Sequence, residues 1–228
     1  MINNKKITAI ILAAGNSTRY GKNKNKNFEL INNKPVLLYS IQIFDKNKYI
    51  DDIIIACKEN EKEEIKTILE KESFTKNINI IIGGKTRKES VYNCINAINS
   101  NIVIIHDGAR PLIKDEYINN SLKYINKYKG TTIGVLTKDT IKLTDENNNV
   151  INTTNRSNTW LIQTPQCFDR LSLLNAHNKY QTEKVTDDCS LLEKEGFKIK
   201  VIPGDYSNIK ITTSDDLDIA TLYIKKEN

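Results

Sequence analysis

The stretch from Ile10 to Gly21, which reads IILAAGNSTRYG, constrains the fold of this chain more than any other segment. An apolar run typical of a buried strand ends here in small residues, and two cations follow, Arg19 and Lys26. Small residues let backbone N–H groups approach an anion closely, and the cations can neutralise phosphate oxygens. Such a loop is where an α/β sheet commonly binds a nucleotide, although a plain tight connection has the same residues. The spacing matches neither GxGxxG nor GxxxxGK[ST], which disfavours dinucleotide dehydrogenases and P-loop NTPases.

The composition describes an ordinary globular chain with a mild basic excess. At 228 residues, with 39% hydrophobic and 27% charged residues, the chain suits one substantial domain with a proper core. The formal net charge of +6 is spread along the sequence instead of gathered in blocks. Nucleic acid binding would need a basic stripe with interleaved aromatic residues, which the sequence lacks. We therefore expect a small polyanionic substrate and no nucleic acid partner.

Cysteine and histidine usage indicates the compartment. The four cysteines contain no C-x-x-C pair, and the chain has only two histidines, so we expect no zinc site. Scattered cysteines favour reduced thiols and a cytoplasmic location. The N-terminus runs directly into the first apolar run, and no apolar stretch approaches ~20 residues, so we expect neither a targeting segment nor a membrane span.

Apolar β-rich runs alternate with amphipathic helical patterns almost to the end of the chain. Consecutive Ile and Val residues in the strands indicate that both faces of the sheet are covered. We therefore predict an α/β fold, a Rossmann-like and mostly parallel sheet with helices on both faces. The predicted strands are 7–14, 51–57, 78–83, 102–106, 131–136, 160–163 and 198–202, and the predicted helices are 35–46, 58–73, 88–98, 115–128, 170–180, 187–195 and one that opens at Ser214.

A β-hairpin arm interrupts this alternation. Residues 140–144 and 150–154 alternate in the manner of half-exposed strands, and 145–149 form a turn between them. We predict a single domain, 1–228, with this arm inserted at about 138–158. Because such an arm has little to bury alone, we expect a second subunit to cover it, which predicts a homodimer.

The segment from His106 to Pro111 carries the second informative motif. Asp107 follows an apolar strand, at the edge of the sheet where ligands bind. Beside phosphates, one carboxylate is a natural ligand for Mg²⁺ or another divalent cation, which completes its shell with substrate oxygens. The alternative to metal binding is that Asp107 forms a structural ion pair with Arg110. We interpret His106 as a packed, hydrogen-bonded side chain and not as a base.

Several weaker signals accompany these two motifs, and each has a plain structural alternative. Gly84 and Ser90 frame a turn that can approach a ribose or base, or is only a turn. Thr140 and Arg156 begin and end the arm, where they can hold a phosphate or simply face solvent. Lys210 lies in a β-branched run, where exposed lysines are common. Thr186 to Asp188 can supply a carboxylate or cap a helix.

Together these pieces resemble the 2-C-methyl-D-erythritol 4-phosphate cytidylyltransferases of the non-mevalonate isoprenoid pathway. The resemblance covers nearly the whole chain and rests on matches in the family's order. They are Ala13-Ala14-Gly15 through Arg19 and Lys26, Gly83-Gly84 with Arg87 and Ser90, His106-Asp107 with Ala109-Arg110-Pro111, Asp139-Thr140 with Lys142, Arg156, Thr164-Pro165-Gln166, Thr186-Asp187, and Asn208-Ile209-Lys210. Members of this family are nucleotidyltransferases with a Rossmann-like sheet and a hairpin arm exchanged between two subunits.

The resemblance implies roles for many of these residues. Ala13, Ala14 and Gly15 would cradle the phosphates of CTP, with Arg19 and Lys26 reaching them. Gly84 and Ser90 would contact the cytidine, Gly108 would lie beside the ribose, and Asp107 would bind Mg²⁺. The methylerythritol phosphate would be surrounded by Arg110, Thr140, Arg156, Thr164 and Lys210, with Thr140 and Arg156 supplied by the neighbouring subunit. The catalytic set implied is Arg19, Lys26, Arg156 and Lys210.

The implied reaction joins CMP from CTP to 2-C-methyl-D-erythritol 4-phosphate, giving 4-diphosphocytidyl-2-C-methyl-D-erythritol and pyrophosphate. Two alternatives remain open, a ribitol 5-phosphate cytidylyltransferase and a non-catalytic nucleotide-binding module. The sequence also departs from the family. Asn25-Lys26-Asn27 stands where Pro-Lys-Gln is usual, which predicts a more mobile loop. Gly108 replaces a common alanine, and Lys85 stands where an acidic residue is frequent.

Overall fold

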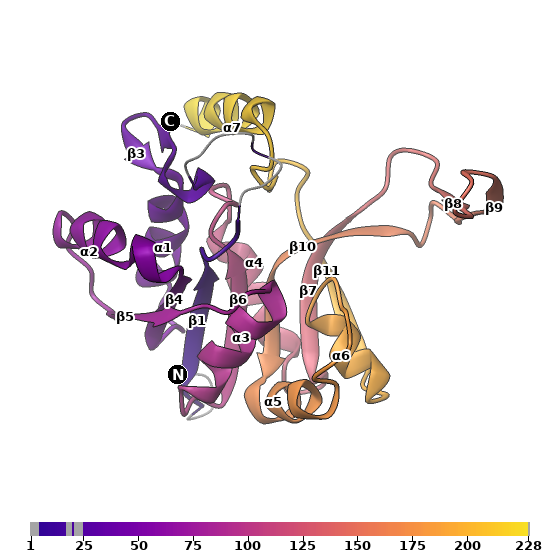
Figure 1. Cartoon of the computed structure of the whole chain (residues 1–228), viewed down its shortest axis with the longest axis horizontal. Coiled ribbons are helices and arrows are strands. Elements are labelled where there is room, and N and C mark those ends of the chain that lie inside the picture. Colours follow the sequence, from indigo (N-terminus) through magenta and orange to yellow (C-terminus); the bar gives the residue numbers. More distant parts are fainter. Residues whose placement is uncertain (1–4, 17–19, 21–24, 228) are drawn as a thin grey trace.

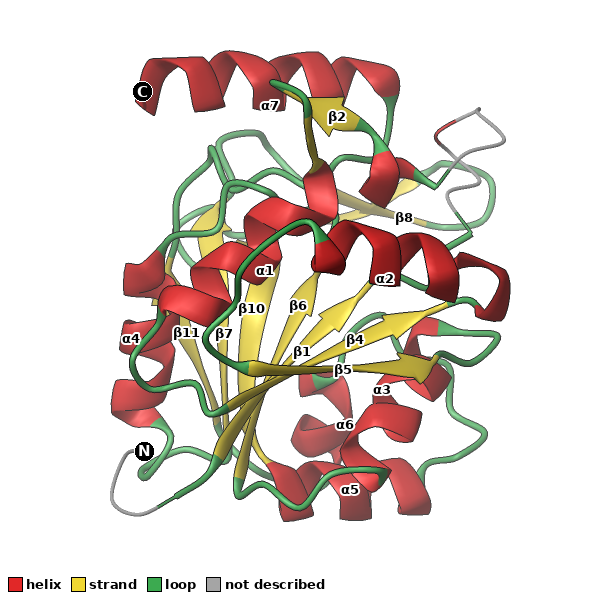
Figure 2. Cartoon of the chain, turned by 90° about the vertical axis from the view of Figure 1, so that its left-hand side faces the viewer, coloured by secondary structure: helices red, strands yellow, loops and turns green. Residues whose placement is uncertain are grey.

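A mostly parallel sheet forms the centre of the molecule (Figures 1 and 2). The computed structural model describes residues 5–16, 20 and 25–227. Within them, seven strands pair in the order β11-β7-β10-β6-β1-β4-β5. The strands are β1 (Ile7–Leu12), β4 (Asp52–Cys57), β5 (Asn77–Ile82), β6 (Ile102–Asp107), β7 (Gly130–Leu136), β10 (Trp160–Asp169) and β11 (Ile199–Pro203). A small separate ladder joins β2 (Leu30–Ile31) to β3 (Lys34–Pro35).

Helices cover both faces of this sheet, as the apolar strands predict. Alternate residues of β1 point to opposite faces, so that Ile11 packs in one core cluster and Ile10 in another. The first cluster includes side chains of α1 (Val36–Lys46), α2 (Lys62–Glu70) and α4 (Asp115–Tyr124). The second includes side chains of α3 (Arg87–Asn96), α5 (Arg170–Lys179) and α6 (Cys189–Lys194). The predicted α/β class, with a covered parallel sheet, is confirmed.

The strand β10 differs from the sequence-based expectation of a short strand at 160–163. It runs for ten residues and pairs antiparallel with both β6 and β7, between two otherwise parallel parts of the sheet. The predicted strand was too short because a proline, here Pro165 after a cis peptide bond, is typical of a strand end. The strand instead bulges between Gln163 and Gln166 and continues. This bulge brings Thr164 to the end of β6.

A hairpin forms where the alternating segments predict one. Its strands, β8 (Lys142–Thr144) and β9 (Val150–Thr153), pair antiparallel and reach away from the sheet (Figure 1). Leu143, Val150 and Ile151 are half or more exposed on it. The described ranges contain no helix long and apolar enough to cross a membrane.

The last helix, α7 (Ser214–Glu227), lies across the end of the molecule at which β1 and β6 finish (Figures 1 and 2). Its buried residues Ala220 and Ile224 share a third core cluster with Ile31 of β2 and with Ile211. The segment that leads into α7 is thereby fixed beside the carboxyl ends of the central strands. That segment carries Lys210.

Candidate active site

A cavity of about 310 Å³ opens at the carboxyl ends of β1 and β6. Five segments meet there: the loop after β1, the short 3-10 helix η2 (Lys26–Phe28), the loop between β5 and α3, the end of β6, and the segment before α7. This is the edge at which parallel sheets bind ligands. The described residues that line it are Leu12, Ala14, Gly15, Asn16, Lys26, Asn27, Gly84, Lys85, Thr86, Arg87, Ser90, Asp107, Ala109, Lys210 and Thr212.

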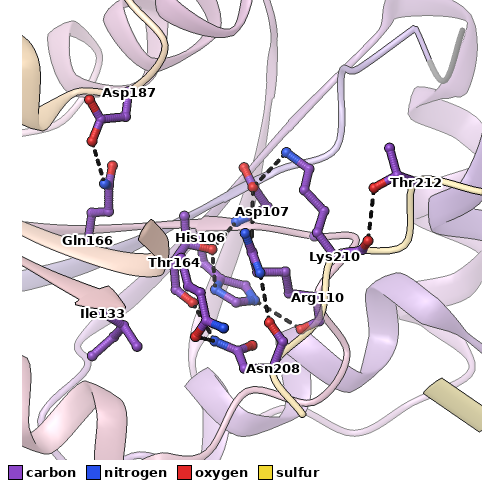
Figure 3. A network of polar contacts seen from close by, with 12 residues as sticks. His106, Asp107, Arg110, Ile133, Thr164, Gln166, Asp187, Asn208, Lys210 and Thr212 are labelled. Atoms are coloured by element: carbon purple, nitrogen blue, oxygen red, sulfur yellow. Dashed lines mark hydrogen bonds and ion pairs between the residues drawn. The ribbon is translucent and has the colours of Figure 1, made fainter. Parts of the chain in front are cut away.

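Asp107, the last residue of β6, lies among three cations (Figure 3 shows two of them). Its Oδ2 atom is 2.7 Å from Lys210 Nζ and 3.7 Å from Arg110 Nε. Its Oδ1 atom is 3.6 Å from Nε of Arg87, the first residue of α3. Burial by itself raises the pKa of the Asp107 carboxyl, but the charges of Lys210, Arg87 and Arg110 outweigh it and lower the pKa far below its usual range. The carboxylate is therefore ionised at any physiological pH.

A buried network behind Asp107 fixes its position. The backbone N–H of Asp107 donates to the Thr164 hydroxyl (3.1 Å), which lies 3.0 Å from Nδ1 of His106. His106 Nε2 lies 3.2 Å from the carbonyl oxygen of Arg110, which can only accept. The proton of the imidazole is therefore on Nε2, and Nδ1 accepts from Thr164. Burial lowers the pKa of His106 to about 3, so its ring is neutral, as the sequence analysis expects of a packed histidine.

Arg110 and Thr164 support the site from behind and are not among the residues that line the cavity. The Arg110 guanidinium donates to the carbonyl oxygen of Asn208 at 2.7 Å. Asn208 is fully buried and donates to the carbonyl oxygen of Thr164 at 3.0 Å. These contacts tie the end of β6 to the bulge of β10 and to the chain before Lys210. A direct contact of Arg110 or Thr164 with a substrate stays a prediction.

The loop after β1 is only partly arranged as the resemblance implies. Ala14 and Gly15 line the cavity, and Asn16 joins them. Ala13 does not offer its N–H to a ligand, because that group donates to the carbonyl oxygen of Ala56 at 2.7 Å. Its own carbonyl oxygen accepts from Asn25. Arg19 lies outside the described residues.

The expected cytidine contacts fall into two groups. Gly84 and Ser90 line the cavity, but the Ser90 hydroxyl already accepts from the Gly84 N–H (3.0 Å) and donates to the carbonyl oxygen of Thr86 (2.9 Å). The hydroxyl therefore shapes the loop, and its contact with the cytidine stays a prediction. Gly108 is buried and is not among the lining residues. A Cβ there would lie 2.9 Å from both Asn27 Oδ1 and Leu37 Cδ1, so packing explains this glycine.

The predicted catalytic lysines meet at the cavity, and the arm residues do not. Lys26 and Lys210 both line it, although they are far apart in the sequence. Thr140 and Arg156 are exposed on the arm, which reaches away from the sheet in Figure 1. Arg156 Nη1 donates to the carbonyl oxygen of Lys138 at 3.4 Å. One chain by itself therefore does not bring these two residues to the cavity.

Sequence reasoning gave Arg87 no role, yet it connects two buried carboxylates. Besides facing Asp107, its Nη1 atom is 2.6 Å from Oδ2 of Asp188, and Asp188 Oδ1 is 3.3 Å from His177 Nε2. Burial by itself lowers the pKa of the Arg87 guanidinium, but Asp188 and Asp107 outweigh it and raise that pKa. The neighbouring Asp187 precedes the N-cap residue of α6, Asp188, and accepts from the Ser190 N–H in the first turn of that helix, which agrees with the structural alternative for that motif. The signals for Arg87 in the sequence are its place at a helix start after paired glycines and its match to the family's motif.

We predict that His106 stays neutral over the whole physiological pH range. Its folded-state pKa of about 3 lies below the ~6.5 of an unfolded histidine, so between these values the unfolded chain binds a proton that the folded protein does not. His106 therefore makes the free energy of unfolding fall as the pH falls through this window. Imidazole ¹⁵N chemical shifts, followed from pH 5 to 8, should show one of the two histidines fixed as the Nε2–H tautomer. Titration of both rings near pH 6.5 would contradict the assignment.

Comparison with known proteins agrees with this geometry. The family model described as IspD, 2-C-methyl-D-erythritol 4-phosphate cytidylyltransferase, matches residues 7–226. Proteins of that name from Caldanaerobacter subterraneus subsp. tengcongensis and Clostridium acetobutylicum are each 44% identical to this chain. The alignments cover 96% of it and 99% and 98% of the relatives.

Comparison with solved structures finds proteins of the same family. The crystal structure of a 4-diphosphocytidyl-2C-methyl-D-erythritol synthase from Anaerococcus prevotii superposes with a TM-score of 0.86 at 35% identity, covering 97% of this chain and 99% of that one. The bifunctional IspDF of Campylobacter jejuni superposes with a TM-score of 0.79 at 28% identity, over 94% of this chain and 54% of its own. The match to the family model over nearly the full length, together with these identities, places the chain in the 2-C-methyl-D-erythritol 4-phosphate cytidylyltransferase family.

Proposed function

We propose that this chain transfers CMP from CTP to 2-C-methyl-D-erythritol 4-phosphate, giving 4-diphosphocytidyl-2-C-methyl-D-erythritol and pyrophosphate. The observation that carries the proposal is the meeting of Lys26, Lys210 and Asp107 at one cavity. These are the two cations and the carboxylate that a reaction between phosphates requires there. Family membership supports the choice of both substrates.

The reaction needs no general base. The second pKa of a phosphate monoester is about 6, so the substrate is already a nucleophile at pH 7. An oxygen of its phosphate attacks the α-phosphorus of CTP in line, and the bond from that phosphorus to the leaving pyrophosphate breaks. His106, whose ring lies in the network behind Asp107, is neutral, and both of its ring nitrogens are hydrogen-bonded in the described structure. The site accordingly relies on position and charge.

The obstacle is the mutual repulsion of two polyanions. Lys26 and Lys210 place positive charge at the cavity from opposite ends of the chain, and Arg19 would add a third charge from the loop after β1. Such charges stabilise the oxygens on which negative charge grows in the transition state, and they hold the reactants in line. Lys210 contacts Asp107, so its ammonium group is already positioned before the nucleotide binds.

A divalent cation fits the site only in company with the nucleotide. The described residues contain no group of three or more His, Cys, Asp and Glu side chains that could hold a metal ion. Asp107 nevertheless presents an ionised carboxylate at the cavity, and Mg²⁺ characteristically takes one or two carboxylates together with phosphate oxygens. Asp107 would therefore hold Mg²⁺ brought with CTP, and the metal would neutralise charge on the triphosphate. The cations around Asp107 keep its carboxyl ionised, and the ionised carboxylate is the form that can bind a metal ion.

The arm completes the site in this proposal. Thr140 and Arg156 lie outside the cavity of their own chain, and the arm exposes Leu143, Val150 and Ile151. Burial of these side chains against a second copy would favour a homodimer. Exchange of arms would bring Thr140 and Arg156 of one subunit to the sugar phosphate in the other.

The experiment that tests the proposed function is release of pyrophosphate from CTP with each of two acceptors. We expect release with 2-C-methyl-D-erythritol 4-phosphate in the presence of Mg²⁺. Faster release with ribitol 5-phosphate would assign the alternative substrate. Binding of CTP without release from either acceptor would identify a nucleotide-binding module. UTP in place of CTP provides the control for the base.

We predict that Lys210→Ala lowers kcat by ~10²-fold or more, the order seen when one transition-state donor is removed. Lys26→Ala should have an effect of the same order. The matched control is Lys200→Ala, because Lys200 is exposed on β11 and is not among the described residues that line the cavity. Steady-state kinetics with a folded variant, checked by circular dichroism, measure the effect. Unchanged turnover in the Lys210 variant would remove it from the mechanism.

Mixing two impaired variants tests whether the arm serves the other subunit. We expect Arg156→Ala to weaken use of the sugar phosphate and Lys26→Ala to weaken catalysis. A hybrid dimer of the two would contain one fully intact site if arms are exchanged. With random exchange half of the dimers are hybrids, so activity should recover to about a quarter of the wild-type value. Co-expressed subunits with different tags provide the sample, and absence of recovery would indicate that each arm serves its own subunit.

A further inference from the structure

The turn that carries Lys26 is anchored and does not have the loose attachment that the sequence analysis expects. Asn25 and Asn27, which flank the lysine, are 7% and 3% exposed, whereas Lys26 itself is half-buried and lines the cavity. Asn25 is the N-cap of η2, and its Oδ1 atom accepts from the Asn27 N–H at 3.1 Å and from Asn27 Nδ2 at 3.0 Å. The two asparagines therefore close the turn around Lys26.

The same asparagines attach this turn to the end of β1. Nδ2 of Asn25 donates to the carbonyl oxygen of Ala13 at 2.9 Å, and Nδ2 of Asn27 donates to that oxygen at 3.2 Å. Ala13 is itself fixed, because its N–H donates to Ala56 of β4. Hydrogen bonds therefore connect the turn to the residue after β1 and, through that residue, to β4. Of these two strands, β1 also contributes Leu12 to the lining of the cavity.

A buried carboxylate provides a second attachment. Glu61 is 8% exposed at the end of the short 3-10 helix η3 (Glu59–Glu61). Both of its carboxylate oxygens lie 3.0 Å from Asn25 Nδ2, and Lys58 Nζ is 3.6 Å from Oε1. A buried carboxylate is costly unless it is hydrogen-bonded, and bonds to a charged acceptor are stronger than neutral ones. The hydrogen bond from Asn25 therefore offsets the cost of burying the Glu61 carboxylate, and Glu61 in turn holds the Asn25 side chain in place.

Gly108 leaves the space that Asn27 occupies. A Cβ at position 108 would lie 2.9 Å from Asn27 Oδ1, a contact that real structures essentially avoid. The departures at positions 25, 27 and 108 are therefore neighbours in space and are compatible with one another. Together they give the turn a fixed place beside β6.

We propose that Asn25 and Glu61 are positioning residues that hold Lys26 at the cavity. Neither belongs to the described lining of the cavity, so each acts through the turn and not by contact with a ligand. A lysine side chain loses much rotamer freedom when it binds an anion. If the backbone of that lysine is already fixed, the conformational entropy lost on binding is smaller. The inference rests on the proposed function in one respect, that Lys26 contacts the triphosphate.

The test measures the Kd of CTP by calorimetry together with kcat and KM. Asn25→Ser keeps a hydroxyl that can cap η2 but is too short to reach Glu61. Glu61→Gln keeps the size of the side chain and removes its charge. We expect Asn25→Ser to raise the Kd of CTP and lower kcat/KM by about tenfold, with a smaller effect of Glu61→Gln in the same direction. The matched control is Glu59→Gln, the same change at an exposed position of the same short helix.

A double-mutant cycle separates positioning from general loss of structure. If Asn25 acts through Lys26, adding Asn25→Ser to Lys26→Ala should cost less than threefold further in CTP affinity. Additive effects would overturn the proposal, as would an unchanged Kd in a folded Asn25→Ser variant. Should Asn25→Ser fail to fold, the cycle is made with Glu61→Gln, to which the same criteria apply.

The failure of this inference differs from the failure of the proposed function. A wild-type protein that binds CTP but transfers no CMP would overturn the reaction, and the Kd values would still test the positioning. A wild-type protein with no affinity for CTP would overturn both.

Discussion

The pairing of Asp107 with Lys210, Arg87 and Arg110 is the interaction on which the rest of the site depends. A carboxylate at this depth would be costly alone, and three cations so close together would repel one another without it. Each therefore keeps the others in place. Because the three cations come from the start of α3, the loop after β6 and the segment before α7, the pairing also joins distant parts of the chain at one edge of the sheet. A polyanionic ligand enters a site whose charges are already arranged.

Much of this could be predicted from residues that are close in sequence. Runs such as Ile102 to Ile105 indicate buried parallel strands, and the small residues after β1 indicate where the sheet opens toward a ligand. The position of Asp107 at a strand end follows from the same pattern. The roles of Lys26 and Lys210 were harder to predict, because the residues around each lysine form no distinctive motif. Only their order relative to the other motifs, through the family resemblance, indicated that they meet.

What could not be predicted depends on contacts between distant residues. Thr164-Pro165 resembles a strand end, yet β10 continues past it because both of its neighbours supply hydrogen bonds. Asn25 and Asn27 resemble loop residues, and only the burial of Glu61, far along the chain, makes them anchors. Arg87 likewise acquires its importance from Asp188, about a hundred residues away. Local propensity carries no information about such partners, so the sequence did not predict the hydrogen bonds that hold Asn25 and Asn27.

The most direct test of the account is a crystal structure with CTP and Mn²⁺, in which anomalous scattering locates the metal. We expect the triphosphate in the cavity lined by Lys26 and Lys210, with the manganese peak beside the Asp107 carboxylate. A second cavity, of about 530 Å³, is lined by His177 and Tyr92 and shares Arg87 with the first. Nucleotide bound there, or manganese away from Asp107, would contradict the central claim.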